Sequence, residues 1–206
     1  MVSDSGAWEE EYNTRGRLWG GETHNLPELP VLSRVLELGC GNGRTLSALI
    51  RRGWDVTAID FAFRAVSLSR EVILDPAHAH IMVADARCPP FKDSTFDAVF
   101  ALHIIGHLCE QDRGRIATIL HRIIKPGGIL FFSDFSPDDF RFGKGSETEP
   151  ATFRRGSGTF THYFTRMEVI SLFSELSLVS IRTHRWPMRV LGTTLLRSEI
   201  QAVFMR

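Results

Sequence analysis

The chain has 206 residues, of which 43% are hydrophobic and 23% charged, and this composition predicts one folded domain with a substantial buried core. Basic and acidic residues number 24 each, so the formal net charge is zero and gives no reason to expect a nucleic-acid or anionic-membrane partner. The three cysteines lack C-x-x-C spacing, so neither a disulfide framework nor a zinc knuckle is indicated. Neither a signal peptide nor an apolar run of membrane-spanning length is visible, and a cytoplasmic location is therefore expected.

The most informative stretch runs from Val35 to Thr45. A short apolar run leads into Gly39-Cys40-Gly41-Asn42-Gly43, and a helical pattern follows directly. Glycines let a turn bend sharply and let a ligand approach the backbone, and Cys40 is a small residue that fits such a turn. The free N–H groups at the start of the helix point into the same space. We therefore predict a nucleotide-binding turn in which Gly39, Cys40, Gly41 and Gly43 contact the ligand.

The spacing of these glycines distinguishes between families. A dinucleotide-binding turn has the pattern G-x-G-x-x-G, whereas here the third glycine comes one residue earlier and Glu37 precedes the first by two. This pattern resembles the E-x-G-x-G-x-G motif of class I S-adenosylmethionine-dependent methyltransferases. The turn Lys125-Pro126-Gly127-Gly128 is a second point of resemblance, which covers Val35 to Ser133. It implies S-adenosylmethionine as the cofactor, with Glu37 orienting the loop or meeting the amino-acid part.

Two carboxylates are expected to hold the remainder of the cofactor. Asp60 follows the first glycine by about twenty residues, where a doubly wound fold places the acceptor for ribose hydroxyls. The alternative for Asp60 is a helix cap. In the resembled family, an acidic residue after the third strand lies near the adenine amino group, and Asp85 holds this position with the backbone of Ala86 beside it. The alternative for Asp85 is a turn residue, and Phe61 and Leu102 complete the predicted cofactor site.

The order of strand and helix patterns predicts a doubly wound, Rossmann-like α/β sheet with helices on both faces. The sheet should be mostly parallel, with an antiparallel last strand, and residues 1–206 should form a single domain. Strands are expected over 34–38, 55–59, 80–83, 96–102, 129–133, 179–184 and 198–205. Helices are expected after the glycine turn, over 62–74, along the apolar stripe 116–124, and from the capping box at Thr165 to residue 176.

Two segments lie outside this pattern. Residues 1–30 are predicted to form a cap segment, either covering the sheet edge or placing Tyr12 or Trp19 over the cofactor, because an aromatic face attracts a sulfonium. Residues 15–20 loosely resemble the leader of small methyltransferases of the tellurite-resistance and thiol-methylating kind. Residues 134–165 combine glycine, serine and charged residues with several phenylalanines, and they are predicted to form a substrate-side lid or loop.

The catalytic residues are less apparent, because methyl transfer needs positioning and uses a base only where the acceptor must lose a proton. His103 and Asp134 follow two strands at the edge where ligands bind, and His162 is a third candidate. His103 could instead pack beside the adenosyl group and so belong to the cofactor site. The H-x-x-x-H spacing of His103 and His107 lacks the glutamate of a zinc motif, so no metal is expected.

The acceptor is inferred from absences. Leu102-His103-Ile104-Ile105 stands where nucleic-acid amino-methylating enzymes have an Asn/Asp-Pro-Pro-Tyr/Phe clamp, and no basic module is appended. We therefore expect a small-molecule acceptor (a thiol, a metalloid, or an oxygen or nitrogen of a metabolite) and no nucleic-acid or membrane partner. The protein is expected to be a monomer or homodimer. The alternatives are a non-catalytic sensor of the cofactor and, with less support from the glycine spacing, a nicotinamide-dependent oxidoreductase.

Overall fold

The computed structural model describes residues 5–18, 26–73 and 76–206. Trp19 and the predicted helix end at residue 74 lie outside these ranges. Five parallel strands form the centre of the sheet: β1 (Arg34–Leu38), β2 (Asp55–Asp60), β3 (Ala79–Val83), β4 (Phe96–Leu102) and β5 (Ile124–Phe135). The full order is β3-β2-β1-β4-β5-β10-β9, and β10 (Thr193–Met205) runs antiparallel to both β5 and β9 (Ser177–Val190). The predicted doubly wound sheet is confirmed.

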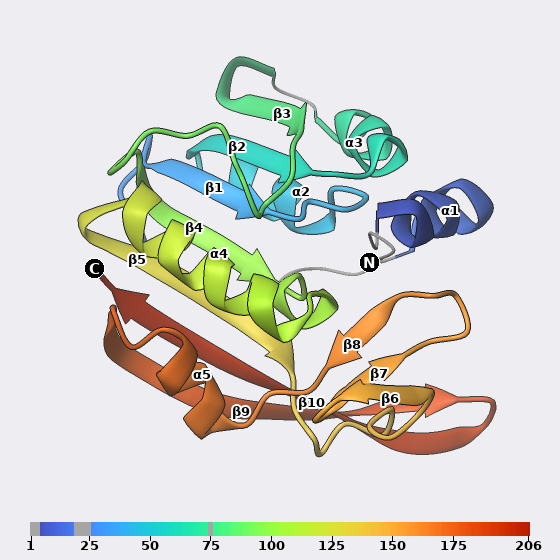
Figure 1. The fold of residues 1–206 in the computed structure, drawn as a ribbon. Coiled ribbons are helices and arrows are strands. Elements are labelled where there is room, and N and C mark those ends of the chain that lie inside the picture. The colour runs from blue at the N-terminus through green and yellow to red at the C-terminus, as the bar shows by residue number, and fades with distance from the viewer. Residues whose placement is uncertain (1–4, 19–25, 74–75) are drawn as a thin grey trace.

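Helices cover both faces of this sheet because successive strand residues point to opposite sides. On one face, Leu36 and Val99 belong to a core shared with α4 (Glu110–Ile123) and α5 (Arg166–Leu172). On the other face, Val35 and Ala98 belong to a second core that includes side chains of α2 (Arg44–Ile50). Figure 1 shows α4 crossing in front of the sheet and α2 behind it. The remaining helices are α1 (Ser5–Arg15), α3 (Phe63–Arg70) and two short 3-10 turns, η1 (Pro76–His78) and η2 (Ile105–His107).

Several element boundaries differ from the sequence prediction. The helix expected over 62–74 ends at Arg70, and the helix expected to reach residue 176 ends at Leu172. Strand β5 begins at Ile124 and not at 129, because Ile124 pairs with Phe96 of β4 before a register shift. The last two strands are longer than expected. Residues 193–198 pair with β9 but not with β5, so β9 and β10 continue past the central sheet as a two-stranded hairpin.

The segment 134–165 folds into a small antiparallel sheet of β6 (Ser146–Glu149), β7 (Thr152–Arg154) and β8 (Phe160–His162). Its aromatic side chains explain why this polar segment is ordered, since Phe153 and Tyr163 form a buried cluster with Phe135. The arrowheads of β1, β2 and β4 point toward the end of the molecule where α1 and the β7–β8 hairpin lie (Figure 1). The carboxyl ends of the parallel strands are therefore flanked by segments from both halves of the chain. No helix in the described ranges has the length and apolar character needed to cross a membrane.

Candidate functional site

A cavity of about 770 Å³ lies at the carboxyl ends of β1, β2, β4 and β5. Ligands of doubly wound folds bind at this edge, where loops from several strands converge. Most of the residues predicted to contact the cofactor line this cavity, namely Tyr12, Glu37, Gly39, Cys40, Gly41, Asp60, Phe61, Asp85, Ala86, Leu102 and His103. The sequence therefore located one wall of the cavity from motifs alone.

The glycine turn is shaped by its contacts with two other segments. Gly41 has a φ of +54°, and its N–H donates to Asp60 Oδ2 at 2.9 Å. A Cβ added at Gly41 would lie 2.6 Å from the hydroxyl oxygen of Tyr12, so α1 places this tyrosine directly against the turn. A side chain here would need both a strained backbone and displacement of Tyr12.

Gly43 does not line the cavity, which corrects its predicted role as a ligand contact. A Cβ at this position would lie 2.6 Å from Val72 Cγ2 and 3.1 Å from Ser69 Cα. The third glycine therefore allows the start of α2 to pack closely against the end of α3. This is a packing requirement, and a spacing pattern cannot separate it from ligand binding.

Asp60 is not the N-cap of α3, which is Ala62, but its carboxylate connects this residue to the glycine turn. Its Oδ1 accepts from the N–H of Ala62, the residue before α3, and its Oδ2 accepts from Gly41, each at 2.9 Å. Burial raises the pKa of Asp60, and the hydrogen bonds from Ala62 and Gly41 oppose that rise. Each carboxylate oxygen retains a second lone pair. Asp60 therefore fastens the turn to α3 and still presents acceptors to the cavity.

Glu37 carries an unmet acceptor at the base of the turn. The side chain is 3% exposed, and its buried Oε2 has no hydrogen-bond partner within the described residues. Burial, and then the nearby charge of Asp60, raise the pKa of Glu37 well above its ordinary value. A buried acceptor without a donor is costly, so a cationic or hydrogen-bonding ligand group would be bound favourably at this point.

Asp85 is held in a fixed orientation by Arg87. Arg87 Nη2 lies 2.7 Å from Asp85 Oδ2, and its Nη1 reaches Asp112 at 3.1 Å on α4. The hydrogen bonds from Arg87 outweigh burial and lower the pKa of Asp85. Asp85 is thus an ionised acceptor beside Ala86 at the cavity wall.

His103 lies between the glycine turn and the residues of β10 that also line the cavity. Its Nε2 lies 3.1 Å from Glu199, its Nδ1 lies 3.8 Å from Asp134, and its ring stacks on Phe135 with centroids 4.4 Å apart. Burial alone lowers the pKa of His103, but the two carboxylates outweigh it and raise the pKa to about 9. A histidine protonated at neutral pH is not available to accept a proton, so this geometry does not favour His103 as a general base.

Asp134 and His162 do not reach the cavity, and the structure places both in supporting positions. Asp134 is 1% exposed and accepts from the N–H groups of Gly106 at 2.7 Å and Phe135 at 3.0 Å. The two ring nitrogens of His162 each lie 2.7 Å from a partner, Thr152 and Glu168. Their predicted catalytic roles are therefore not supported, because their polar atoms are already bonded within the protein. Their positions in the sequence did not reveal these partners.

The opposite wall comes from the β9–β10 hairpin, which the sequence prediction did not connect with the site. Alternate residues of a strand share one face, and here they are Arg197, Glu199 and Gln201 on β10 with His184, Trp186 and Met188 on β9. The sequence did contain a signal for this wall, because polar residues occupy every second position of the otherwise apolar last strand. Ile104 and His107, which the sequence places after the fourth strand at the ligand edge, also line the cavity. The lining residues that were not predicted are Trp8, Leu18, Asn42, Arg44, Thr45, Arg87, Leu108, Phe131, Ser133 and Phe135.

Glu199 is the centre of a hydrogen-bond network on this wall. Gln201 Nε2 donates to it at 2.6 Å, and His184 Nδ1 lies 3.5 Å away. Burial raises the pKa of Glu199, but His103 and these partners outweigh it and lower the pKa to about 2. The ring of Phe135 lies below two guanidinium groups, those of Arg141 at 4.0 Å and Arg197 at 4.8 Å. This end of the cavity is aromatic and polar, and two of its buried atoms, His103 Nδ1 and Ser133 Oγ, have no hydrogen-bond partner among the described residues.

A family model described as a methyltransferase domain matches residues 36–132, which contain the glycine turn, Asp60 and Asp85. These residues belong to a class I S-adenosylmethionine-dependent methyltransferase domain. The cofactor is S-adenosylmethionine, and the cavity suits it: Gly39 and Gly41 of the turn line it together with an unmet carboxylate oxygen on Glu37 and two further carboxylates along one wall. Among the described residues, no group of three or more His, Cys, Asp or Glu could hold a metal ion.

Two relatives and one solved structure are similar to this chain. The tRNA N(3)-cytidine methyltransferase METTL2 of Danio rerio is 30% identical over 173 residues, covering 78% of this chain and 49% of the relative. The tRNA N(3)-methylcytidine methyltransferase Mettl2 of Drosophila melanogaster is 27% identical, covering 83% and 60%. The chain thus spans about half of the curated relatives it matches. An S-adenosylmethionine-dependent methyltransferase of Methanosarcina mazei has the same fold, with a TM-score of 0.70 at 23% identity over 86% of this chain and 94% of the other.

These relatives overturn the expectation of a small-molecule acceptor with no nucleic-acid partner. Net charge was uninformative because it averages over the surface and hides local clusters of arginine. The absence of the Pro-Pro clamp is evidence only against methylation of an exocyclic amine. It does not exclude a ring nitrogen, which is the atom named for these relatives. The methyltransferase family also replaces the two alternatives, a cofactor sensor and a nicotinamide-dependent oxidoreductase. The loose likeness of residues 15–20 to tellurite-resistance enzymes stays a prediction.

Proposed function

We propose that this methyltransferase domain transfers a methyl group from S-adenosylmethionine to a ring nitrogen of a base in tRNA, with N3 of cytidine as the first candidate. The observation that carries the proposal is that one cavity joins the glycine turn to a wall formed by the half-buried Trp186 and the guanidinium of Arg197 beside it. Aromatic side chains bind unpaired bases by stacking, and this mode dominates sequence-specific recognition of RNA. The names of the two relatives support the same acceptor.

The shape of the site requires the target base to leave the RNA stack. The cavity is lined by buried side chains, among them those of Glu37, Glu199 and Phe135, and a base paired within a duplex cannot reach groups at that depth. Arg197 Cζ lies 4.8 Å from the Phe135 ring centroid and 5.3 Å from that of Trp186, so the guanidinium bridges the two rings. An extruded base would meet the half-buried Trp186, the Arg197 guanidinium and the Glu199 carboxylate on the same wall.

The chemistry fits a site without a free general base. N3 of neutral cytosine carries a lone pair, so no proton has to be removed before it attacks, and catalysis depends on holding the base in line. The cofactor, when bound, supplies the activated methyl group. Positive charge develops on the base as the methyl group arrives. Glu199 lines the cavity and its partners lower its pKa to about 2, so its negative charge on this wall stabilises that developing charge.

On the cofactor side, the proposal assigns roles to six of the predicted residues. Gly39, Gly41 and Glu37 hold the amino-acid part, because the unmet Glu37 oxygen suits an ammonium donor. Asp60 accepts from the ribose hydroxyls with its remaining lone pairs. Asp85 accepts from the adenine amine, with the Ala86 backbone beside it.

The proposal also includes the predicted domain organisation, oligomeric state and roles of the two segments outside the sheet pattern. Residues 1–206 act as a single domain, either monomeric or dimeric. Residues 1–30 cap the cofactor through Tyr12, and residues 134–165 form the substrate-side lid. The three cysteines are free, which suits the reducing cytoplasm.

A methylation assay tests the proposed acceptor. Unmodified tRNA transcripts are incubated with the protein and S-adenosylmethionine, digested to nucleosides and analysed by mass spectrometry against 3-methylcytidine and 5-methylcytidine standards. We expect 3-methylcytidine with the wild type and none with Asp60→Ala, which should lose the cofactor. Methyl transfer to a different base, or none by protein shown to bind S-adenosylhomocysteine, would refute the assignment.

A further inference from the structure

A second cavity of about 480 Å³ adjoins the first and has a different character. The two share part of their lining, including Phe135 and His107. The second is lined by four arginines, Arg15, Arg17, Arg141 and Arg155, and by a single acidic residue, Glu11. It therefore carries an excess of positive charge beside the acceptor end of the methyltransferase cavity, although the whole chain is neutral.

The arginines of this cavity are incompletely neutralised. Glu11 lies 3.0 Å from Arg15. Arg141 lies 3.0 Å from Asp139, but the same carboxylate also binds Arg197 at 2.6 Å, so two cations share one anion. Arg155 makes no ion pair within the described parts of the chain. Its partners there are neutral oxygens, among them Lys144 O at 2.9 Å.

Unmet and adaptable donors accompany this charge. Arg141 Nη2 is buried and lacks a hydrogen-bond partner among the described residues. The turn between β7 and β8 adds the hydroxyls of Ser157 and Thr159, which lie 3.0 Å apart. Guanidinium groups and hydroxyls are the donors that bind phosphate oxygens in proteins. The cavity thus offers donors of the required kind. Three of its four arginines also pair with carboxylates, those of Glu11, Glu71 and Asp139, and Arg155 does not.

We propose that this second cavity binds a backbone phosphate of the RNA strand adjacent to the target nucleotide. This inference rests on the proposed tRNA acceptor and adds a subsite to it. The two sites are connected through Phe135, whose ring contacts His103 of the acceptor site and lies 4.0 Å below the guanidinium carbon of Arg141. A base extruded from a strand remains attached to its phosphates, so a phosphate site beside the base site holds the nucleotide in the extruded position.

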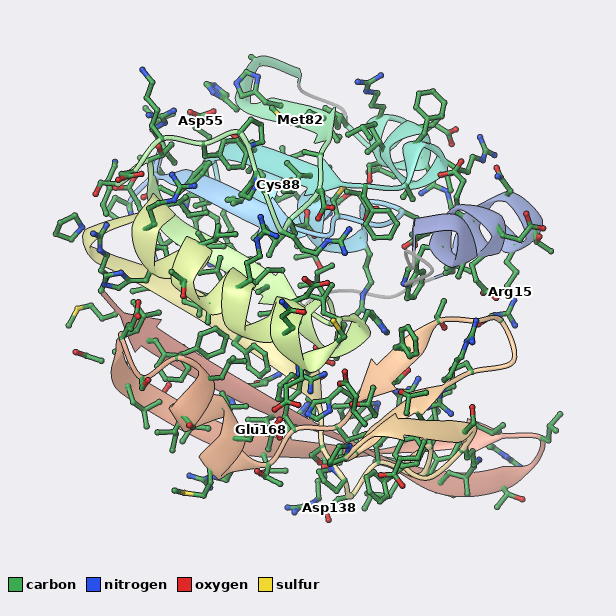
Figure 2. The ribbon with its side chains drawn as sticks, viewed as in Figure 1. Arg15, Asp55, Met82, Cys88, Asp138 and Glu168 are labelled. Atoms are coloured by element: carbon green, nitrogen blue, oxygen red, sulfur yellow. The ribbon has the colours of Figure 1, made fainter. Side chains whose placement is uncertain are left out.

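Arg15 offers the cleanest test, because it lies on the surface of α1 and its side chain extends toward the β7–β8 hairpin (Figure 2). The matched control is Arg52→Gln, since Arg52 is also a surface arginine with an ion pair at 3.0 Å, to Glu28, and lies away from both cavities. Arg155→Gln removes the arginine without an ion pair. Arg15→Gln provides the test if Arg155→Gln fails to fold.

The first measurement is the affinity for fluorescently labelled tRNA, by anisotropy, over a range of salt concentrations. We expect Arg15→Gln and Arg155→Gln each to raise Kd about tenfold and to lower the slope of log Kd against log salt by about 1. Arg52→Gln should match the wild type. Wild-type affinity and slope in both cavity variants would overturn the proposal.

The second measurement uses no RNA and separates this inference from the proposed function. Sodium tripolyphosphate is titrated into the wild type by calorimetry, with succinate as the carboxylate comparison. We expect tripolyphosphate to bind, succinate to bind at least tenfold more weakly, and Arg155→Gln to lose the signal. Equal binding of succinate would overturn the phosphate assignment. If tripolyphosphate binds but tRNA is not methylated, the RNA acceptor is wrong and the phosphate site stands; if tRNA is methylated but the variants behave as wild type, the phosphate site is wrong.

Discussion

The two ends of the methyltransferase cavity are built in different ways. Apart from Tyr12 on α1, the predicted cofactor contacts come from one continuous stretch, residues 37–103, in which successive strand ends contribute. The acceptor end combines residues that are far apart in the chain, from Trp8 on α1 to Gln201 on β10. A cofactor shared by a whole family can be bound by local motifs, whereas an acceptor is bound by whatever the fold brings to the opposite wall.

The two ends also differ in electrostatics. At the cofactor end, burial raises the pKa of both Glu37 and Asp60, and Glu37 retains an unmet oxygen. At the acceptor end, Glu199 pairs with His103 Nε2, while the buried His103 Nδ1 and Ser133 Oγ have no hydrogen-bond partner among the described residues. Both ends therefore have polar atoms for a ligand to satisfy, but they differ in charge, because the partners of Glu199 lower its pKa to about 2. Four experiments separate these properties.

The largest effect is expected for Gly41→Ala. A left-handed backbone costs about 1–3 kcal/mol for a residue other than glycine, and the new Cβ would meet the Tyr12 hydroxyl at 2.6 Å. We expect affinity for S-adenosylhomocysteine, measured by calorimetry, to fall about 100-fold. Gly114→Ala on α4 is the control, since its Cβ meets nothing within 4 Å. Unchanged affinity in Gly41→Ala would show that the turn does not hold the cofactor.

The next effect concerns pH. The pKa of His103 is raised from 6.5 to about 9, so its stabilising contribution is complete below pH 6.5 and is lost as the pH rises through 9. We expect the free energy of unfolding, from urea titrations at pH 6 and pH 10, to fall by about 2 kcal/mol in the wild type. His103→Gln should show little of this loss. The same pH dependence in both proteins would mean that His103 is not paired as the structure has it.

A smaller effect is expected for Trp186→Ala on the hairpin. Stacking of one base is worth about 1–3 kcal/mol, so KM for tRNA should rise about tenfold. The affinity for S-adenosylhomocysteine should be unchanged, which separates the two ends of the cavity. Leu191→Ala, at the exposed hairpin turn outside the cavity, is the control. Equal losses in both variants would place RNA contact along the hairpin and not at the aromatic wall.

The smallest effect is expected for Thr165→Ala, which touches neither end. The Thr165 hydroxyl accepts from the N–H of Glu168 at 3.2 Å as part of a capping box for α5. Loss of such a cap costs about 1 kcal/mol of stability, which thermal unfolding would detect. Both affinities should remain at wild-type values. A loss of tRNA binding would show that Glu168 and its partner His162 affect the acceptor site from a distance.

The sequence alone determined the sheet, the glycine turn and the carboxylates at the strand ends, because each depends on residues close together in the chain. Periodicity predicted the observed bounds of β1 and β4. Spacing predicted Asp60 and the family resemblance predicted Asp85 as site residues, and both line the cavity. Spacing did not reveal that Gly43 serves packing or that Asp134 and His162 are already bonded, since partners distant in sequence decide both.

Only the tertiary structure decided what faces the cofactor. Strand β10 returns antiparallel beside β5 and continues into a hairpin with β9, which carries Trp186, Arg197 and Glu199 to the cavity. The buried pairing of His103 with Glu199 joins residues far apart in the chain, and the shift in the pKa of each depends on that contact. Local patterns report how a segment folds, but the chemistry of a site depends on charges and surfaces that meet only after the chain has closed upon itself.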